Sequence, residues 1–180
     1  MKRLVSQPEI HRKRNSSGFS LIELLIVVAI ILVIAAIAIP NLIRARIAAN
    51  ESSAASSVRR IAIAEIAYNA AYPTVGYSPD LASLGGPATN CAPSSASACM
   101  IDSILASGTK SGYELNAAGF SSSGGPNDSF VASSAPQMFD ITGVRDFCIV
   151  TDGVLRVEPG SSGGAPAPDV ATCMKYAGAQ

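Results

Sequence analysis

The stretch GFSLIELLIVVAIILVIAAIAIP, residues 18 to 40, decides the fold of this chain. From Phe19 to Ile39 every side chain is apolar except those of Ser20 and Glu23. A helix of about 21 residues, rising 1.5 Å per residue, crosses a hydrocarbon core about 30 Å thick. Length and composition therefore predict a membrane-spanning helix.

Glu23 is the residue in this segment that needs a physical reason. A charge at the centre of a membrane helix costs about 3 kcal/mol, whereas each Leu, Ile or Val favours insertion by about 0.3 to 0.6 kcal/mol, so insertion remains favourable. An acid kept inside a membrane segment indicates a partner. The nearest cation would be a free amine on Phe19, and that amine exists only if the chain is cut after Gly18.

These residues resemble the class III signal of type IV pilins and of the pseudopilins of type II secretion. Gly18 matches the glycine before the cut, Phe19 the first mature residue, which that family N-methylates, and Glu23 the family's invariant glutamate. The resemblance implies cleavage by a prepilin peptidase and methylase on the cytoplasmic side, so that the helix stays attached. The alternative is an ordinary secretory signal, which loses its helix, because the Ala-rich residues 35–38 could imitate its cleavage site.

Charge supports an anchored protein with a cytoplasmic leader. Basic residues outnumber the single acid, Glu9, ahead of the apolar run, and the positive-inside rule keeps such a segment in the cytoplasm. Without the leader, eight of the 13 Lys and Arg residues and 12 of the 13 acids remain, which argues against a dedicated nucleic-acid binder. Four basic residues follow the membrane segment: Arg44, Arg46, Arg59 and Arg60. We expect them to stabilise the helix by pairing with Glu51 or Glu65. Contact with DNA is a weak alternative.

The helix should continue from residue 19 to about Tyr72, where Pro73 stops it. Its second half carries an apolar stripe that needs a sheet to cover it. Pro40 should weaken the helix, and the resemblance places it where the family's helix bends or melts in filaments. We expect a cleaved cytoplasmic leader (1–18), a transmembrane or filament-core half-helix (19–40), an amphipathic half-helix (41–72) and an extracytoplasmic β-sheet head (73–180).

Strand signals occur at residues 112–116, 129–133, 146–151 and 154–158, and Asp152-Gly153 predicts a hairpin turn between the last two. A short helix is expected at 79–84, and residues 159–168 read as a linker-like tail. One long helix with a small antiparallel sheet predicts an α+β fold, which matches the ladle shape of pilins. The segment GVRDFCIVTDGVLRVEP, from Gly143, weakly resembles a hairpin of relatives of the major pseudopilin.

Four cysteines lie beyond the membrane segment, where an oxidising compartment favours disulfides. Three pairings exist, and we favour Cys91 with Cys99 and Cys148 with Cys173, because each pair closes a short segment of low apolar content. Zinc is disfavoured, because the spacings contain no C-x-x-C pair.

No enzyme is expected, because the only histidine, His11, lies in the leader. No cofactor is expected either, although the resemblance to the major pseudopilin offers Asp146 and Asp152 as weak calcium candidates. We therefore expect a homo-oligomeric pilus-like filament that supports adhesion, motility or DNA uptake. Before assembly its subunit would be anchored in the bacterial inner membrane. An assembly platform in that membrane would be its direct partner, and the assembly ATPase an indirect one. The alternatives are a type II secretion pseudopilin in a short periplasmic filament, and a monomeric membrane-anchored binding domain.

Overall fold

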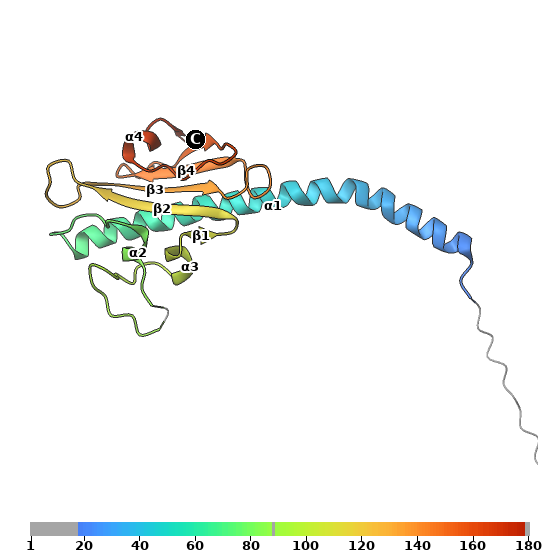
Figure 1. Ribbon diagram of the computed structural model, residues 1–180, viewed down its shortest axis with the longest axis horizontal. Coiled ribbons are helices and arrows are strands. Elements are labelled where there is room, and N and C mark those ends of the chain that lie inside the picture. Colours follow the sequence, from blue (N-terminus) through green and yellow to red (C-terminus); the bar gives the residue numbers. More distant parts are fainter. Residues whose placement is uncertain (1–17, 88, 179–180) are drawn as a thin grey trace, which may run out of the picture. The chain divides into compact units, whose positions relative to one another are not determined.

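The computed structural model describes residues 18–87 and 89–178, so the rest of the leader lies outside the described residues. It contains one long helix, α1 (Leu21–Ala71), and an antiparallel sheet with six strands in the described residues (Figure 1). The α+β class expected from the sequence is confirmed. The chain divides into two compact units between Pro40 and Asn41.

The first unit is the apolar half of α1. Its large apolar side chains are exposed from Leu21 to Ile39, and none of its most apolar 18-residue window, with a mean hydropathy of 3.3, is buried. By length and composition this helix can cross a membrane. Pro40 lies inside α1, which is helical on both sides of it and through it.

The second unit, residues 41–178, is called the head below, and its strands are paired in chain order. Two of the strands, at the edges of the sheet, were not predicted, because two residues are too few to show an alternation of apolar and polar side chains. Three short helices accompany the sheet, and each begins after an Asp whose carboxylate accepts a backbone N–H of the first turn. The strands are β1 (Thr109–Lys110), β2 (Tyr113–Phe120), β3 (Ser129–Pro136), β4 (Arg145–Val150), β5 (Arg156–Pro159) and β6 (Ala177–Gly178), and the helices are α2 (Leu81–Leu84), α3 (Ser103–Ala106) and α4 (Val170–Cys173).

The β4–β5 hairpin is wider than its sequence suggests. The predicted strand at 154–158 begins two residues late, at Arg156, and pairing ends where Arg156 faces Cys148. Asp152 explains the difference, because its carboxylate accepts the N–H of Val154 and the guanidinium of Arg156, which holds the intervening residues in a loop. Gly153 takes a φ of 72°, which glycine adopts readily.

The main core lies between α1 and one face of the sheet. Val58, Ile61 and Tyr68 are fully buried and belong to one cluster with Tyr113 and Phe130. Their spacing of three and seven residues follows one face of a helix, which confirms the predicted need for a covering sheet. Burying a side chain of this size contributes about 1.5 to 3 kcal/mol, so this cluster dominates the stability of the head.

The opposite face of the sheet carries a second, smaller core. Val131 and Cys148 point to this face, because successive side chains of a strand alternate. Ala167 and Cys173 cover them, and the hydroxyl of Ser133 donates to the carbonyl of Ala167 at 2.8 Å. Most of residues 159–168, expected as a linker-like tail, have no regular secondary structure, but Ala167 near their end packs in this second core. Helix α4, which follows, lies beside β4 in Figure 1.

Candidate functional site

The junction before α1 holds the predicted processing residues. Gly18, Phe19 and Ser20 precede the helix, and the side chain of Phe19 is 89% exposed. A Cβ placed on Gly18 would meet no atom within 4 Å, so no contact in the described part of the chain requires glycine there. Both residues that flank the predicted cut, Gly18 and Phe19, are exposed.

Glu23 has a partner inside its own chain. The backbone N–H of Ser20 donates to Oε2 of Glu23 at 3.0 Å, and the N–H of Leu24 donates to the carbonyl of Ser20 at 3.2 Å. Ser20 and Glu23 therefore have the spacing and one of the two hydrogen bonds of a capping box, which satisfies a donor at a helix start. This contact was not predicted from the sequence, although the S-x-x-E pattern was there to be read.

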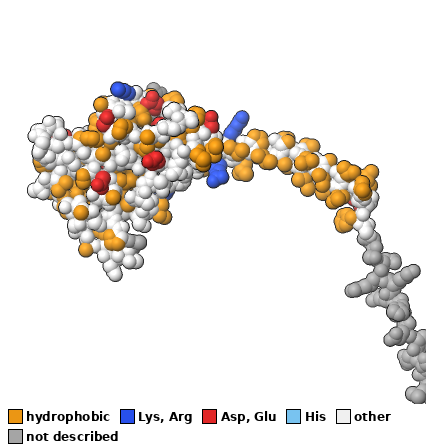
Figure 2. Space-filling view, viewed as in Figure 1, with side chains coloured by type: hydrophobic (Ala, Val, Ile, Leu, Met, Phe, Trp, Pro, Cys, Tyr) orange, Lys and Arg blue, Asp and Glu red, His pale blue; other side chains and the backbone are white. Residues whose placement is uncertain are grey.

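Two exposed arginines, Arg44 and Arg46, follow Pro40 on α1. In Figure 2, blue basic side chains gather on α1 at the edge of the head, after the stretch of the helix that is covered by apolar side chains.

The comparisons agree with this geometry over the N-terminal segment. A family model described as the prokaryotic N-terminal methylation motif matches residues 13–39, which include Gly18, Phe19 and Glu23. The N-terminal segment therefore carries the methylation motif that the sequence led us to expect. The type IV wide pilus major component PilA4 of Thermus thermophilus is 62% identical over 39 residues, which are 22% of this chain and 30% of that protein. No solved structure matches the chain.

The two acids of α1 within the head, Glu51 and Glu65, have other partners than the sequence led us to expect. Glu51 pairs with Arg145 of β4 rather than with an arginine of its own helix. Glu65 is fully buried and accepts the backbone N–H of Ser78 at 2.7 Å. Arg60 instead reaches Asp102 at 3.1 Å. The predicted pairing within α1 was therefore wrong, because both acids are buried on the side of α1 that faces the rest of the head.

Burial raises the pKa of two carboxyl groups of the head. Desolvation raises the pKa of Glu65 to about 8, opposed by the hydrogen bond from Ser78 and assisted by the charge of Asp80. Desolvation, followed by the charge of Glu158, raises the pKa of Asp146 to about 6. One oxygen of each group, Oε1 of Glu65 and Oδ1 of Asp146, is buried without a hydrogen-bond partner in the described part of the chain.

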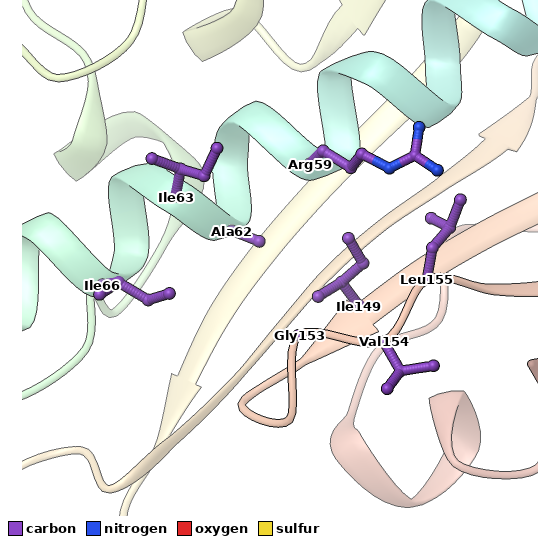
Figure 3. A pocket seen from close by; sticks show the side chains of 8 residues that line it. All are labelled: Arg59, Ala62, Ile63, Ile66, Ile149, Gly153, Val154 and Leu155. Atoms are coloured by element: carbon purple, nitrogen blue, oxygen red, sulfur yellow. The ribbon is translucent and has the colours of Figure 1, made fainter.

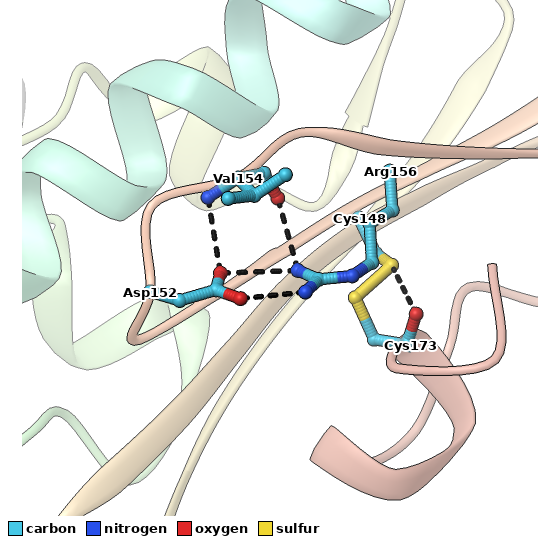
Figure 4. Close-up of polar contacts among 5 residues, drawn as sticks. All are labelled: Cys148, Asp152, Val154, Arg156 and Cys173. Carbon is cyan, nitrogen blue, oxygen red and sulfur yellow. Dashed lines mark hydrogen bonds and ion pairs between the residues drawn. A yellow bond between two sulfur atoms is a disulfide. The ribbon is translucent and has the colours of Figure 1, made fainter. Parts of the chain in front are cut away.

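Asp146 and Asp152, the weak calcium candidates, are not brought into one site. Asp146 is the second residue of β4, which ends at Val150, so about 13 Å of strand lies between Asp146 and the turn that holds Asp152. Both oxygens of Asp152 accept hydrogen bonds from Arg156 (Figure 4). Among residues 18–87 and 89–178, no group of three or more His, Cys, Asp or Glu residues is placed to hold a metal ion.

The cysteines are joined as the spacing favoured. Disulfides link Cys91 to Cys99 and Cys148 to Cys173. The second disulfide ties β4 to α4 beneath the Asp152–Arg156 pair (Figure 4).

A groove of about 560 Å³ lies between α1 and the β4–β5 loop. Figure 3 shows Ile63 and Ile66 on the helix side and Ile149, Val154 and Leu155 on the hairpin side. Arg59 is the one charged residue that lines it. Such a lining suits an apolar surface and offers no nucleophile or general base for catalysis.

Proposed function

We propose that this chain is a structural subunit of a type IV pilus-like surface filament, with no catalytic role of its own. The observation that carries the proposal is the arrangement at the N-terminus. An accessible Gly18–Phe19 bond stands directly before a helix whose first half is apolar and wholly exposed, with Glu23 in its first turn. This arrangement suits a prepilin peptidase that cuts after Gly18 and N-methylates Phe19.

The assembly mechanism follows from the solvation of the helix. Before assembly the segment from Phe19 to Pro40 is surrounded by lipid of the bacterial inner membrane, with the leader in the cytoplasm. In the filament it is surrounded by the same segments of neighbouring subunits, so it never faces water. Glu23 of an incoming subunit binds the free amine of Phe19 at the end of the filament, because an unpaired charge in an apolar bundle is costly.

A contact of this kind is head-to-tail and does not close into a ring, so it generates an open helical filament. Assembly requires an inner-membrane platform, and the energy comes from an ATPase that acts through that platform. The filament then serves adhesion, motility or DNA uptake at the cell surface. DNA contact through Arg44, Arg46, Arg59 or Arg60 is the weakest of these roles, because the mature chain is acidic overall.

Mass spectrometry of protein sheared from native cells tests the proposal. We expect an abundant chain that begins at N-methyl-Phe19 and is four hydrogens lighter than the reduced sequence, because it contains two disulfides. The Gly18→Val variant should accumulate as an uncut precursor in the membrane, since valine at this open position disturbs only the peptidase. A surface protein that begins at another residue would contradict the proposal.

One observation favours a pseudopilin as a second candidate. The segment that resembles the pseudopilin hairpin forms a real structural unit, in which Arg145 binds Glu51 and Arg156 binds Asp152. In that case the mature chain would be found in membranes and in short periplasmic filaments of type II secretion, and not in the sheared surface fraction.

The apolar groove beside α1 is the observation that would favour a monomeric membrane-anchored binding domain. That function requires no polymer, so it predicts that Glu23 is dispensable.

A further inference from the structure

The groove between α1 and the β4–β5 loop leaves large apolar side chains open to solvent. Ile63 is 67% exposed, Ile66 is 56% exposed, and Val154, on the hairpin side, is 43% exposed. Arg59 lies at one end of the groove and Ile66 at the other (Figure 3). None of the ion pairs among residues 18–87 and 89–178 includes Arg59. An exposed apolar surface with one unpaired charge indicates a binding site for another segment.

The loop between β3 and β4, residues 137–143, carries the complementary groups. Met138 is 52% exposed and Ile141 is 61% exposed, and the exposed acid Asp140 lies between them. Asp140 takes part in no ion pair within the described part of the chain. The apolar pair suits the apolar lining of the groove, and the acid suits Arg59.

Hydrogen bonds inside the loop hold these groups in one arrangement. The N–H of Thr142 donates to the carbonyl of Met138 at 2.9 Å, and the N–H of Met138 donates to the hydroxyl of Thr142 at 3.1 Å. The N–H of Asp140 donates to the carbonyl of Gly143 at 3.0 Å. A loop that is held in this way loses little conformational entropy when it binds.

The other exposed large apolar side chains of the head fit the groove less well: Leu42, Ile43, Ile104 and Met174. Arg44 directly follows the first two and Lys175 directly follows the last, so either segment would bring a second cation to Arg59. The acid near Ile104, Asp102, is already paired with Arg60. Of the described residues outside the groove, the loop 137–143 is therefore the segment that combines exposed apolar side chains with an unpaired acid.

A molecule cannot place this loop in its own groove. The side chain of Asn50 donates to the carbonyl of Thr142 at 3.0 Å, which fixes the loop beside this part of α1. Ile63 lies 13 residues after Asn50, and this separation corresponds to about 20 Å of helix rise. The loop can therefore reach a groove only on another copy of the chain. Because loop and groove are different surfaces, such a contact is heterologous and can repeat from subunit to subunit.

We propose that the loop 137–143 of one subunit docks in the groove between α1 and the β4–β5 loop of a second copy of this chain. Met138 and Ile141 pack against the isoleucines of the groove, and Asp140 pairs with Arg59. The inference rests on the filament of the proposed function. A loop of seven residues is smaller than the about 20 to 30 residues a side of a stable interface, so the contact joins heads that the helices already hold together.

Photocrosslinking within filaments sheared from cells tests the contact. The full chain carries p-benzoylphenylalanine in place of Ile141, and a matched control carries the same probe in place of Ile104, which is 63% exposed. After irradiation, crosslinked dimers are isolated and the attachment sites are mapped by mass spectrometry. We expect several times more dimer from position 141 than from position 104, with attachment at residues 59–66 or 153–155 of the second copy.

A double-mutant cycle tests the pairing of Asp140 with Arg59. Asp140→Asn removes the charge and keeps a residue type that tolerates the positive φ of 63° at this position. Asp140→Asn and Arg59→Gln should each lower the dimer yield from position 141 about two- to fivefold, as expected for an exposed ion pair. The double variant should lose no more than either single variant, because both remove the same contact. Lys175→Gln, which removes an exposed cation outside the groove, should leave the yield unchanged.

Three results would overturn the docking: equal dimer yields at positions 141 and 104, attachment of the probe at 141 mainly to residues 19–40 of a neighbour, or multiplied losses in the double variant. The filaments themselves separate the two proposals. If no filament of chains that begin at Phe19 is recovered, the proposed function fails and the docking with it. Filaments with that N-terminus but without crosslinks into the groove contradict the docking alone.

Discussion

Arg145 and Glu51 join β4 to α1 through an ion pair with a closest N–O distance of 2.5 Å. The carboxylate is almost completely buried, whereas half of the guanidinium side chain is exposed. Glu51 also accepts the N–H of Val144 at 3.0 Å, so one side chain fixes both the start of β4 and the loop before it. This contact sets the position of the helix against the end of the sheet.

Replacing Glu51 by Gln should lower the free energy of unfolding by about 1 to 3 kcal/mol, because it removes a buried charge-assisted hydrogen bond. Arg60→Gln is the matched control, since the pair of Arg60 with Asp102 is exposed and contributes about 0 to 1 kcal/mol. Urea denaturation of the full chain in detergent measures both. Equal losses for the two variants would contradict a special role for Glu51.

Glu65 should make the head less stable as the pH rises. Its folded pKa of about 8 lies above the ordinary value of 4.5, so above pH 4.5 the unfolded chain releases a proton that the folded chain keeps. Stability from this group is complete below about pH 4.5 and is lost progressively up to about pH 8. Thermal unfolding of Glu65→Gln should lack this loss and should show a higher Tm than the wild type at pH 8. A difference in Tm that does not change with pH would refute the assignment.

The two disulfides should differ in their contribution to stability. On the chain-entropy model, the sequence separations of 25 and 8 correspond to about 3.5 kcal/mol for Cys148–Cys173 and about 2.5 kcal/mol for Cys91–Cys99. The double change Cys148→Ala and Cys173→Ala should cost more still, because it also releases α4 from the second core. Denaturation of both double variants gives the two losses in free energy of unfolding. A larger loss for the variant without Cys91–Cys99 would contradict the role of α4 in covering the second core.

Glu23 has one observed contact, with Ser20, and one proposed role in the filament, and a pair of variants separates the two. Glu23→Ala removes both the charge and the acceptor for the N–H of Ser20, whereas Glu23→Gln keeps an acceptor and removes the charge. Pairing with the amine of a neighbouring Phe19 predicts that both variants insert into the membrane and that neither forms filaments of normal length. Electron microscopy of sheared material decides, and normal filaments from Glu23→Gln would reduce the role of Glu23 to local capping.

Most of the fold was accessible from the sequence. The long helix ends within a residue of the position set by Pro73, and four strands begin close to their predicted starts. The expectation failed for Glu65, which was interpreted as a surface partner of an arginine. Glu65 lies four residues after Ile61 and three before Tyr68, so the period that predicted the apolar stripe also placed this acid on the buried face. Glu65 was assigned to the surface because it is an acid, although its place in the helical period indicated burial.

The second core was harder to predict, for a physical reason. Ala167 and Cys173 provide few apolar atoms, and no periodicity marks them as a cover for the sheet. Only the expected disulfide between Cys148 and Cys173 indicated that the C-terminal segment returns to β4, and it gave no sign that Ala167 would be buried there. Similarly, the sequence identified Gly18, Phe19 and Glu23 as the candidate N-terminal site. The hydrogen bond between Ser20 and Glu23 was found only in the structure.

Both outer strands of the sheet, β1 and β6, are only two residues long. A long unpaired strand is a template on which another chain can add its own backbone, and such growth leads to amyloid-like aggregation. The head offers little template of that kind in its described residues. Under the proposed function, ordered assembly would then depend on the apolar helix and on its cleavage, and the sheet edges would add no competing route of association.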